Sequence, residues 1–301
     1  MRPLPALGIY IGAVFVGGAL VAPWLFWIAQ FFANIFPHIA SSPFHRFVNR
    51  SLLSLALIGL WPLFRFLGAR SFRDLGLVNP RRHGKTIAAG FGFGFVSLAI
   101  VALTALATGA RVLSGNSHIP GKLLSAALTA IVVAVLEEIL FRGALFGALR
   151  KAKGWFLALI GSSVVYALMH FMESAQLVGP VSWHSGLDLL PRMLRGLANW
   201  QQLVPGFFNL ALAGALLALA YQRTGNLCFS IGLHAGWIFW LKSYGFLTHA
   251  VPGANPWIWG GTKLIDGWMA LLVLASTLVL FLRLPFPTSS EASTGTAKAP
   301  A

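Results

Sequence analysis

Long apolar runs with almost no charge recur along the whole of this 301-residue chain. A helix of about 20 such residues is long enough to cross the roughly 30 Å of hydrocarbon in a bilayer. In that medium the backbone must satisfy its own hydrogen bonds, so only helices or closed barrels can span it. The runs are continuous and lack the alternation of barrel strands. We therefore predict an all-α, polytopic transmembrane helical bundle of about eight helices. The expected spans are residues 7–36, 51–67, 86–108, 123–149, 155–171, 207–221, 227–247 and 264–282.

The spacing of these spans predicts four segments. They are residues 1–85 with N-terminal transmembrane helices and an interfacial elbow, 86–250 with a helical core, 251–286 with a C-terminal transmembrane helix, and 287–301 with a disordered tail rich in Ser, Thr and Ala.

Two stretches between the spans are expected to lie at the membrane surface. In the elbow, residues 72–85, Leu75, Leu77 and Val78 can reach lipid while Arg73 and its neighbours meet head groups, unless the stretch is a plain solvated loop. The longest stretch outside the spans, residues 173–205, is predicted to hold an interfacial helix.

The charge of the chain indicates a lipid partner and no nucleic acid. Its net charge is +15, but the 22 Lys and Arg residues are spread over loops and form no basic domain. They are expected to touch lipid head groups and to set the topology. More of them fall on the side of the N-terminus, so the positive-inside rule places both termini in the cytoplasm. We expect a multi-pass protein of the plasma membrane, which in bacteria is the inner membrane.

A pair of acidic residues stands inside one predicted span. The chain has only seven Asp and Glu residues, and Glu137 and Glu138 are adjacent within an apolar helix. A carboxylate at the bilayer centre costs at least about 2.5 kcal/mol, so such residues usually face the bundle interior and have a function. Arg142 lies one turn after Glu138 and is expected to pair with it. Glu137 points about 100° away and is the better candidate for a general base. The alternative is an ion pair that only fixes helix packing.

Two histidines are expected at the depth of the glutamates. At about 1.5 Å per residue, Glu137, His170 and His234 come to similar heights on three different helices. Two carboxylates and two histidines at one level of the membrane predict a reaction site.

The chemistry of this site leaves the cofactor open. Zn²⁺ could bind through Glu137, His170 and His234, although no HExxH pattern is present and Cys228, the only cysteine, excludes a Cys-based zinc site. Without a metal, Glu137 and His170 would polarise a water that attacks a peptide carbonyl, and His234 would stabilise the oxyanion.

Three stretches resemble the motifs of the CPBP family of intramembrane proteases, the group of type II CAAX prenyl proteases, lysostaphin-resistance-protein-A-like and Abi proteins. Residues 136–142 (LEEILFR) resemble the EExxxR motif, residues 166–170 (YALMH) resemble FxxxH with Tyr for Phe, and residues 227–240 (LCFSIGLHAGWIFW) resemble the region of HxxxN. The similarity covers about residues 86–244. It implies an eight-helix bundle, which in the members that process prenylated proteins has a water-filled cavity open toward the cytoplasm.

The resemblance also implies roles for the five candidate residues. Glu137 would activate water, Glu138 and Arg142 would support it, His170 would help to hold the water, and His234 would belong to the oxyanion side.

One residue departs from the family pattern. Ile238 stands where HxxxN has its Asn, which removes a hydrogen-bond donor. Three nearby side chains are candidates to replace it: Trp237, Asn209 and Ser230.

The function favoured by these residues is hydrolysis of a peptide bond in a membrane-associated or lipid-modified protein or peptide. Two alternatives stay open: a catalytically impaired relative that acts as a binding or immunity protein, and a proton-coupled transporter that uses Glu137 and the histidines. The motifs do not decide whether the substrate is prenylated.

Overall fold

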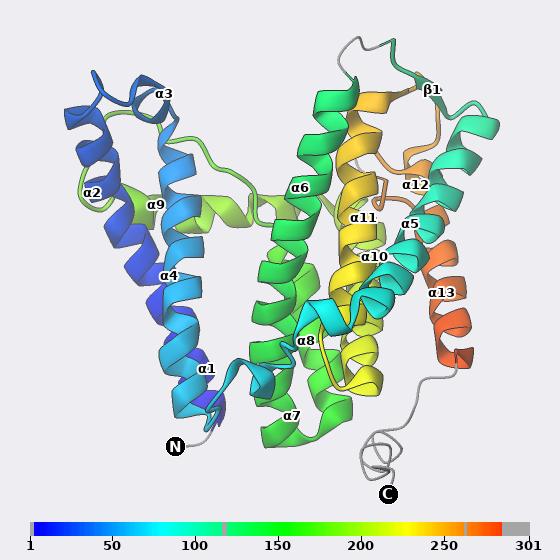
Figure 1. Cartoon of the computed structure of the whole chain (residues 1–301). Helices are drawn as coiled ribbons and strands as arrows, with labels where there is room; N and C mark the ends of the chain where they lie inside the picture. Colours follow the sequence, from blue (N-terminus) through cyan, green and yellow to red (C-terminus); the bar gives the residue numbers. More distant parts are fainter. Residues whose placement is uncertain (1–2, 116–118, 262–263, 285–301) are drawn as a thin grey trace, which may run out of the picture. The chain divides into compact units, whose positions relative to one another are not determined.

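The computed structural model describes residues 3–115, 119–261 and 264–284 and confirms the predicted all-α architecture (Figure 1). The predicted tail, 287–301, lies outside the described residues. The chain divides into two compact units. The N-terminal unit comprises residues 1–70 and 168–200, and the core unit comprises residues 71–167 and 201–301.

The N-terminal unit is built on the helical segment Pro5–Phe31, which packs antiparallel against the helix Phe44–Phe66 (Figure 1). The elements of this unit are α1 (Pro3–Gly12), η1 (Ala13–Gly17), α2 (Gly18–Phe31), α3 (Pro37–Ala40), α4 (Phe44–Phe66), α9 (Ser185–Met193) and η5 (Leu194–Ala198). Pro23 has no N–H and so leaves the Ala19 carbonyl without its helical donor. At that carbonyl α9 approaches α2 through Gly186, where any Cβ would collide. The helix α9 lies in the long stretch 173–205, where the sequence predicts a helix.

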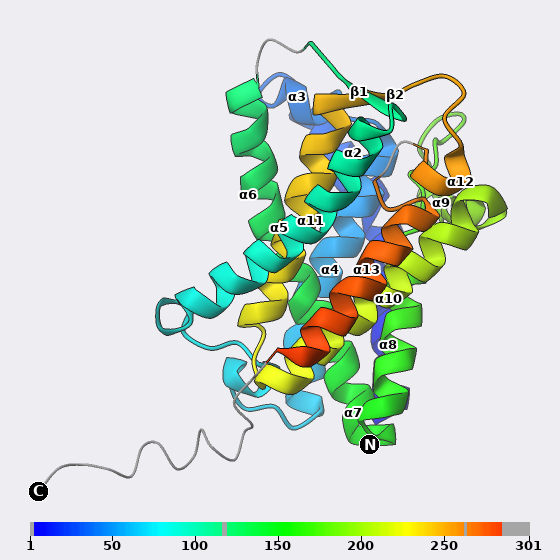
Figure 2. The same cartoon turned by 90° about the vertical axis from the view of Figure 1, so that its right-hand side faces the viewer.

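The core unit holds the remaining helices (Figure 2). They begin with η2 (Phe72–Leu75), η3 (Pro80–Arg82), α5 (Gly84–Ala107), β1 (Arg111–Leu113), α6 (Ile119–Glu138), η4 (Ile139–Phe146), α7 (Gly147–Lys153) and α8 (Trp155–Met169). They continue with α10 (Trp200–Thr224), α11 (Cys228–Leu247), β2 (Thr248–Ala250), α12 (Pro256–Trp259) and α13 (Trp268–Arg283).

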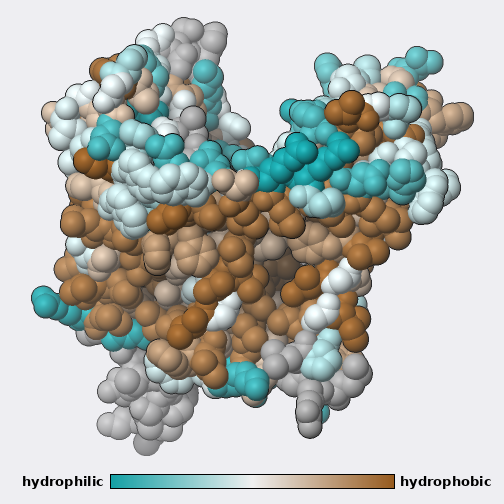
Figure 3. Space-filling view, turned by 180° about the vertical axis from the view of Figure 1, so that it is seen from behind, coloured by the Kyte–Doolittle hydropathy of each residue, from teal (hydrophilic) through white to brown (hydrophobic). Residues whose placement is uncertain are grey.

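Among the described residues, five helical segments are long and apolar enough to cross a membrane: Pro5–Phe31, Phe44–Phe66, Gly84–Ala107, Ile119–Lys153 and Leu203–Thr224. The helices Trp155–Met169 and Trp268–Arg283 are apolar but shorter. Brown, hydrophobic side chains make up much of the surface seen in Figure 3, as lipid contact requires. The remaining predicted span, 227–247, coincides with α11, most of which is buried by protein.

Four glycines join α5 and α11 along a seam. Gly90 and Gly94 of α5 lie against the carbonyls of Phe229 and Leu233, and Gly232 and Gly236 of α11 lie against the backbone of α5 in return. Small residues four apart let two membrane helices approach until their backbones touch. Both helices lie side by side in Figures 1 and 2. We call these four residues the glycine seam.

A short two-stranded sheet ties the ends of the same two helices. β1 follows α5, β2 follows α11, and the strands pair antiparallel with Val112 opposite His249. The buried Arg111 guanidinium donates to the Thr248 hydroxyl at 3.0 Å and to its carbonyl at 3.2 Å, and it lies 4.5 Å from the centre of the Tyr244 ring. We call β1, β2 and Arg111 the clasp.

The elbow packs on protein rather than only on lipid, which corrects the expectation for Leu75. Its side chain is 3% exposed. Next to it, Gly76 takes a left-handed conformation (φ +80°) beneath the Tyr221 ring, and its carbonyl accepts from Leu227 N at 2.8 Å. Elbow and α11 are thereby held together within the core unit.

Candidate active site

Glu138 is the last residue of α6 and lies at the centre of a buried polar cluster. Its side chain is 0% exposed and that of Arg142 is 2% exposed. Arg142 Nη1 lies 3.0 Å from Glu138 Oε1, so the expected ion pair is present. Arg142 Nη2 also donates to the Gly214 carbonyl at 3.3 Å. Both partners of the pair are therefore fixed between helices.

The helix changes its winding where Arg142 stands. Directly after Glu138 the chain continues as the π-helix η4, and the N–H of Gly147 reaches back to the Arg142 carbonyl five residues before it. π-Helical turns are rare and occur often at functional sites. No periodic signal in the sequence indicates this wider turn, since the apolar pattern runs through it without a break.

His234 joins the cluster from α11 and is 3% exposed. Its Nδ1 lies 2.9 Å from Glu138 Oε1. Its Nε2 lies 3.2 Å from the Tyr166 hydroxyl and 3.8 Å from Glu137 Oε2. Because Gly232 and Gly236 flank it on the glycine seam, its backbone is held against α5.

Glu137 is the more open of the two glutamates. Its side chain is 26% exposed, whereas that of Glu138 is fully buried. The two carboxylates approach different nitrogens of the same imidazole. The structure thus brings together Glu137, Glu138, Arg142 and His234, four of the five residues that the sequence singled out.

The fifth candidate, His170, follows the end of α8 and is half-buried. It belongs to the stretch 168–200, which is part of the N-terminal unit. Its place beside the glutamates therefore stays a prediction.

Tyr166 is the member of the cluster that sequence reasoning missed. It lies on α8 within the core unit, is 3% exposed, and packs edge to face on Phe141 with 5.0 Å between ring centres. The Arg142 guanidinium lies 4.4 Å from the centre of its ring. The signal was present in the sequence, because YALMH has a hydroxyl-bearing Tyr where the resembling motif has Phe.

The three candidates to replace the missing Asn bind elsewhere, which corrects that expectation. Trp237 Nε1 donates to Ser97 Oγ at 2.8 Å, Asn209 Nδ2 donates to the carbonyls of Ile265 and Gly267 at 2.7 and 2.9 Å, and Ser230 Oγ donates to the Leu227 carbonyl at 3.1 Å. In each case the hydrogen bond holds the donor on a backbone carbonyl or on Ser97 of α5.

Ile238 itself belongs to an apolar cluster between α6 and α11, with Ala130, Ala134 and Ala235. It is 7% exposed, so this position of α11 serves helix packing.

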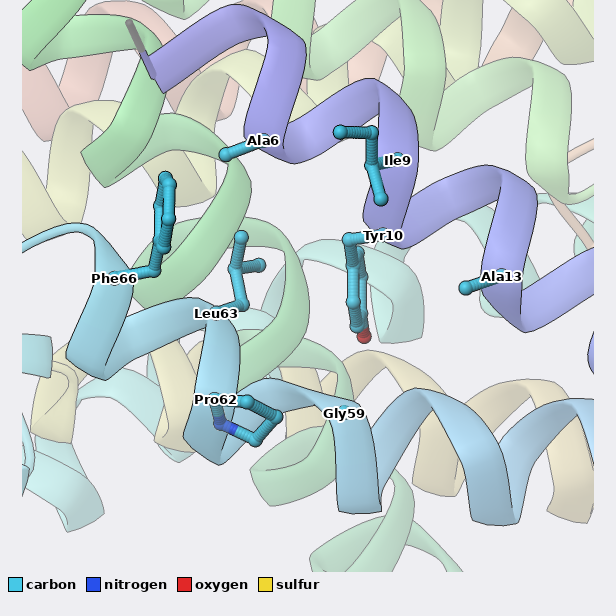
Figure 4. Close-up of a pocket in the computed structure, with 8 residues that line it drawn as sticks. All are labelled: Ala6, Ile9, Tyr10, Ala13, Gly59, Pro62, Leu63 and Phe66. Carbon is cyan, nitrogen blue, oxygen red and sulfur yellow. The ribbon is translucent and has the colours of Figure 1, made fainter. Parts of the chain in front are cut away.

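No group of three or more His, Cys, Asp or Glu side chains within the described parts of the chain could hold a metal ion. The set of Glu137, His170 and His234 stays a prediction, because His170 belongs to the N-terminal unit. A cavity of about 270 Å³ between α1 and α4 has no charged lining residue (Figure 4). That cavity offers no acid, base or nucleophile apart from Tyr10, whose hydroxyl donates to the Ala56 carbonyl.

Comparison with known families identifies the segment that carries this cluster. Residues 119–240 match the family described as type II CAAX prenyl endopeptidase, Rce1-like. The matched segment runs from the start of α6 into α11 and contains all five candidate residues. Searches of curated proteins and of solved structures found no match to the chain. Residues 119–240 therefore match an Rce1-like type II CAAX prenyl endopeptidase domain, which confirms the resemblance to the CPBP family.

Proposed function

We propose that this chain is an intramembrane endopeptidase that uses Glu137 to activate water. One observation carries the proposal: the accessible Glu137 carboxylate and the buried His234 imidazole lie side by side, with Glu137 Oε2 3.8 Å from Nε2. A carboxylate that is partly open and lies beside an imidazole is suited to accept a proton from water. The family of the domain supports proteolysis in general.

In the proposed reaction, Glu137 takes a proton from water while the water oxygen forms a bond to the carbonyl carbon of a peptide. The π electron pair of the carbonyl moves onto its oxygen, which becomes an oxyanion on the side of His234. When this intermediate collapses, the C=O bond forms again, the C–N bond breaks, and the leaving amine takes the proton that Glu137 held. His170 would help to hold the attacking water, as the resemblance implies.

Glu138 and Arg142 support this reaction without taking part in it. Oε1 of Glu138 lies within 3.0 Å of Arg142 Nη1 and 2.9 Å of His234 Nδ1. A carboxylate paired with a guanidinium only accepts hydrogen bonds, so Nδ1 of His234 is the donor in this contact. The pair therefore fixes the orientation of the imidazole, as carboxylates do for catalytic histidines.

A prenylated peptide that ends in a CAAX sequence is the substrate to test first. The family description names such substrates, and a lipid chain would bring the peptide into the bilayer where the site lies. Membrane-associated proteins without a prenyl group are the second class.

A catalytically impaired binding or immunity protein is the competing function, and the apolar packing of Ile238 favours it. The test is cleavage of a farnesylated CAAX-type peptide by the purified full-length protein in detergent, followed by mass spectrometry of the products. A parallel reaction with a chelator measures metal dependence.

Glu137→Gln is expected to abolish cleavage, because the amide is nearly isosteric but accepts no proton. Its melting temperature should match that of the wild type. Glu173→Gln is the matched control, since Glu173 is exposed and is not one of the candidate site residues. Activity of Glu137→Gln within a few-fold of the wild type would exclude Glu137 as the base.

A further inference from the structure

We propose that His234 is neutral with its proton on Nδ1, and that the Tyr166 hydroxyl therefore donates the hydrogen bond that stabilises the oxyanion. This assignment rests on the proposed endopeptidase function and names a residue that the reaction above leaves unused.

The first step concerns the proton on His234. Glu138 Oε1 forms the ion pair with Arg142 Nη1 at 3.0 Å and lies 2.9 Å from His234 Nδ1, and an ionised carboxylate can only accept there, so Nδ1 carries a proton. A neutral imidazole has a single N–H, which leaves only a lone pair on Nε2. The nitrogen that faces Glu137 and Tyr166 is therefore an acceptor. An oxyanion needs a donor, and this nitrogen supplies none.

The second step concerns the group beside that nitrogen. The Tyr166 oxygen lies 3.2 Å from Nε2, so its O–H is the donor in this contact. A hydroxyl hydrogen rotates about its C–O bond and can turn from one acceptor to another nearby. When a negatively charged oxygen forms next to Nε2, the same O–H can turn to it. Charge-assisted bonds are roughly twice as strong as neutral ones, so the turn is favourable.

The third step concerns how firmly the hydroxyl is held. The Tyr166 ring is confined by the edge of Phe141 and by the Arg142 guanidinium above its face. The positive charge of Arg142 also lowers the energy of negative charge forming nearby. Donors that are fixed before the reaction are the ones that stabilise a transition state most effectively.

The other side chains considered for this role are occupied, since Trp237, Asn209 and Ser230 donate to Ser97 or to backbone carbonyls. Tyr166 thus supplies within this chain the donor that Ile238 does not.

The kinetic test replaces the hydroxyl alone. Tyr166→Phe keeps the contacts of the ring with Phe141 and Arg142, so the protein should fold, with a small fall in melting temperature for the lost hydrogen bond to His234. Loss of one oxyanion donor lowers kcat by about 10² to 10³-fold, and KM should change little, because the bond forms only with the oxyanion. Tyr221→Phe is the matched control: Tyr221 is also buried beneath an arginine, Arg150, but lies outside the site, and it should keep the wild-type kcat. Wild-type kcat in Tyr166→Phe would overturn the proposal.

A second measurement needs no turnover. Nitrogen NMR of the full-length protein labelled in its histidine side chains, with His234 assigned by its loss in His234→Asn, shows which ring nitrogen carries the proton. We expect a protonated Nδ1, a bare Nε2, and a shift of the Nε2 resonance in Tyr166→Phe. A proton on Nε2, either in the neutral imidazole or in the imidazolium, would overturn the proposal, because His234 would then be the donor. If the wild type cleaves no peptide, the proposed function fails, while the NMR result still decides whether Tyr166 is the donor to His234.

Discussion

A single oxygen atom organises the polar cluster of this protein. Glu138 Oε1 lies at hydrogen-bond distance from both Arg142 and His234. Because all three side chains are buried, each has lost its contacts with water, and its interactions with the other two replace them. The energetic reason for an acidic residue at this depth is therefore its two partners as well as any role in catalysis.

Arg142→Ala is expected to lower stability by about 3 to 5 kcal/mol, because it leaves Glu138 with an uncompensated buried charge. Accumulation in the membrane and activity should both fall. A thermal melt of the purified variant measures the effect. An Arg142→Ala protein as stable as the wild type would show that the ion pair is not formed in the membrane.

Replacing both partners separates stability from activity. Glu138→Gln with Arg142→Gln removes both charges, so we expect most of the stability to return. Activity should stay low, because an amide in place of the Glu138 carboxylate no longer fixes the proton of His234 on Nδ1. Thermal melts and cleavage rates of the double variant check both expectations. Recovery of full activity would mean that Glu138 does not orient the imidazole.

Part of this site could be predicted from the residues alone. The Glu138–Arg142 pair follows from helical spacing, and His234 follows from helix rise and the depth it implies. Tyr166 could not be placed, because the partner of a hydroxyl depends on how α8 is rotated toward α11. In the same way, the rotation of α11 about its axis determines that Trp237 faces Ser97 on α5.

Among the elements, the glycine seam determines how closely α5 and α11 approach. A Cβ on Gly94 would collide with the Leu233 carbonyl, one residue before His234. The seam therefore couples helix packing to the position of the imidazole.

Gly94→Ala is expected to cost about 1 to 3 kcal/mol, since the two backbones must separate. Activity should fall as well, because His234 would move away from Glu138. Gly92→Ala is the matched control on the same helix, where a Cβ meets nothing within 4 Å. Thermal melts and cleavage rates of the two variants give the comparison. Equal melting temperatures would mean that the seam opens without cost.

The apolar runs predicted the helices well because lipid leaves the backbone few choices. The elbow and the clasp were harder to foresee. Leu75 is buried through tertiary contact with the core unit, and β1 and β2 are too short to show an alternating pattern. In both places contacts between distant parts of the chain decide the structure.

At the scale of the whole molecule, the chain passes through its two units in an order that the sequence did not show. Residues 168–200, from the end of α8 to the first residue of α10, belong to the N-terminal unit and contain α9, while the residues before and after them belong to the core unit. The predicted core segment, 86–250, does not show that this stretch belongs to the other unit, because the sequences of α8 and α10 both have the composition of ordinary membrane spans. Whether the termini lie in the cytoplasm stays a prediction.

The clasp and the glycine seam have a consequence for motion. They hold α11 to α5 at one end and along its length, so the backbone of α11 opens only when much of the core unit opens with it. Amide hydrogens in such a segment exchange with solvent more slowly than those in less constrained helices. We expect α11 to be the last helix of the core unit to take up deuterium, after α6 and α8, in exchange measured by mass spectrometry. Uptake in α11 as fast as in α6 would contradict this. If α11 is the slowest helix to exchange, His234 stands on the side of the site that moves least. A substrate would then enter by displacement of the helices that carry Glu137 and Tyr166.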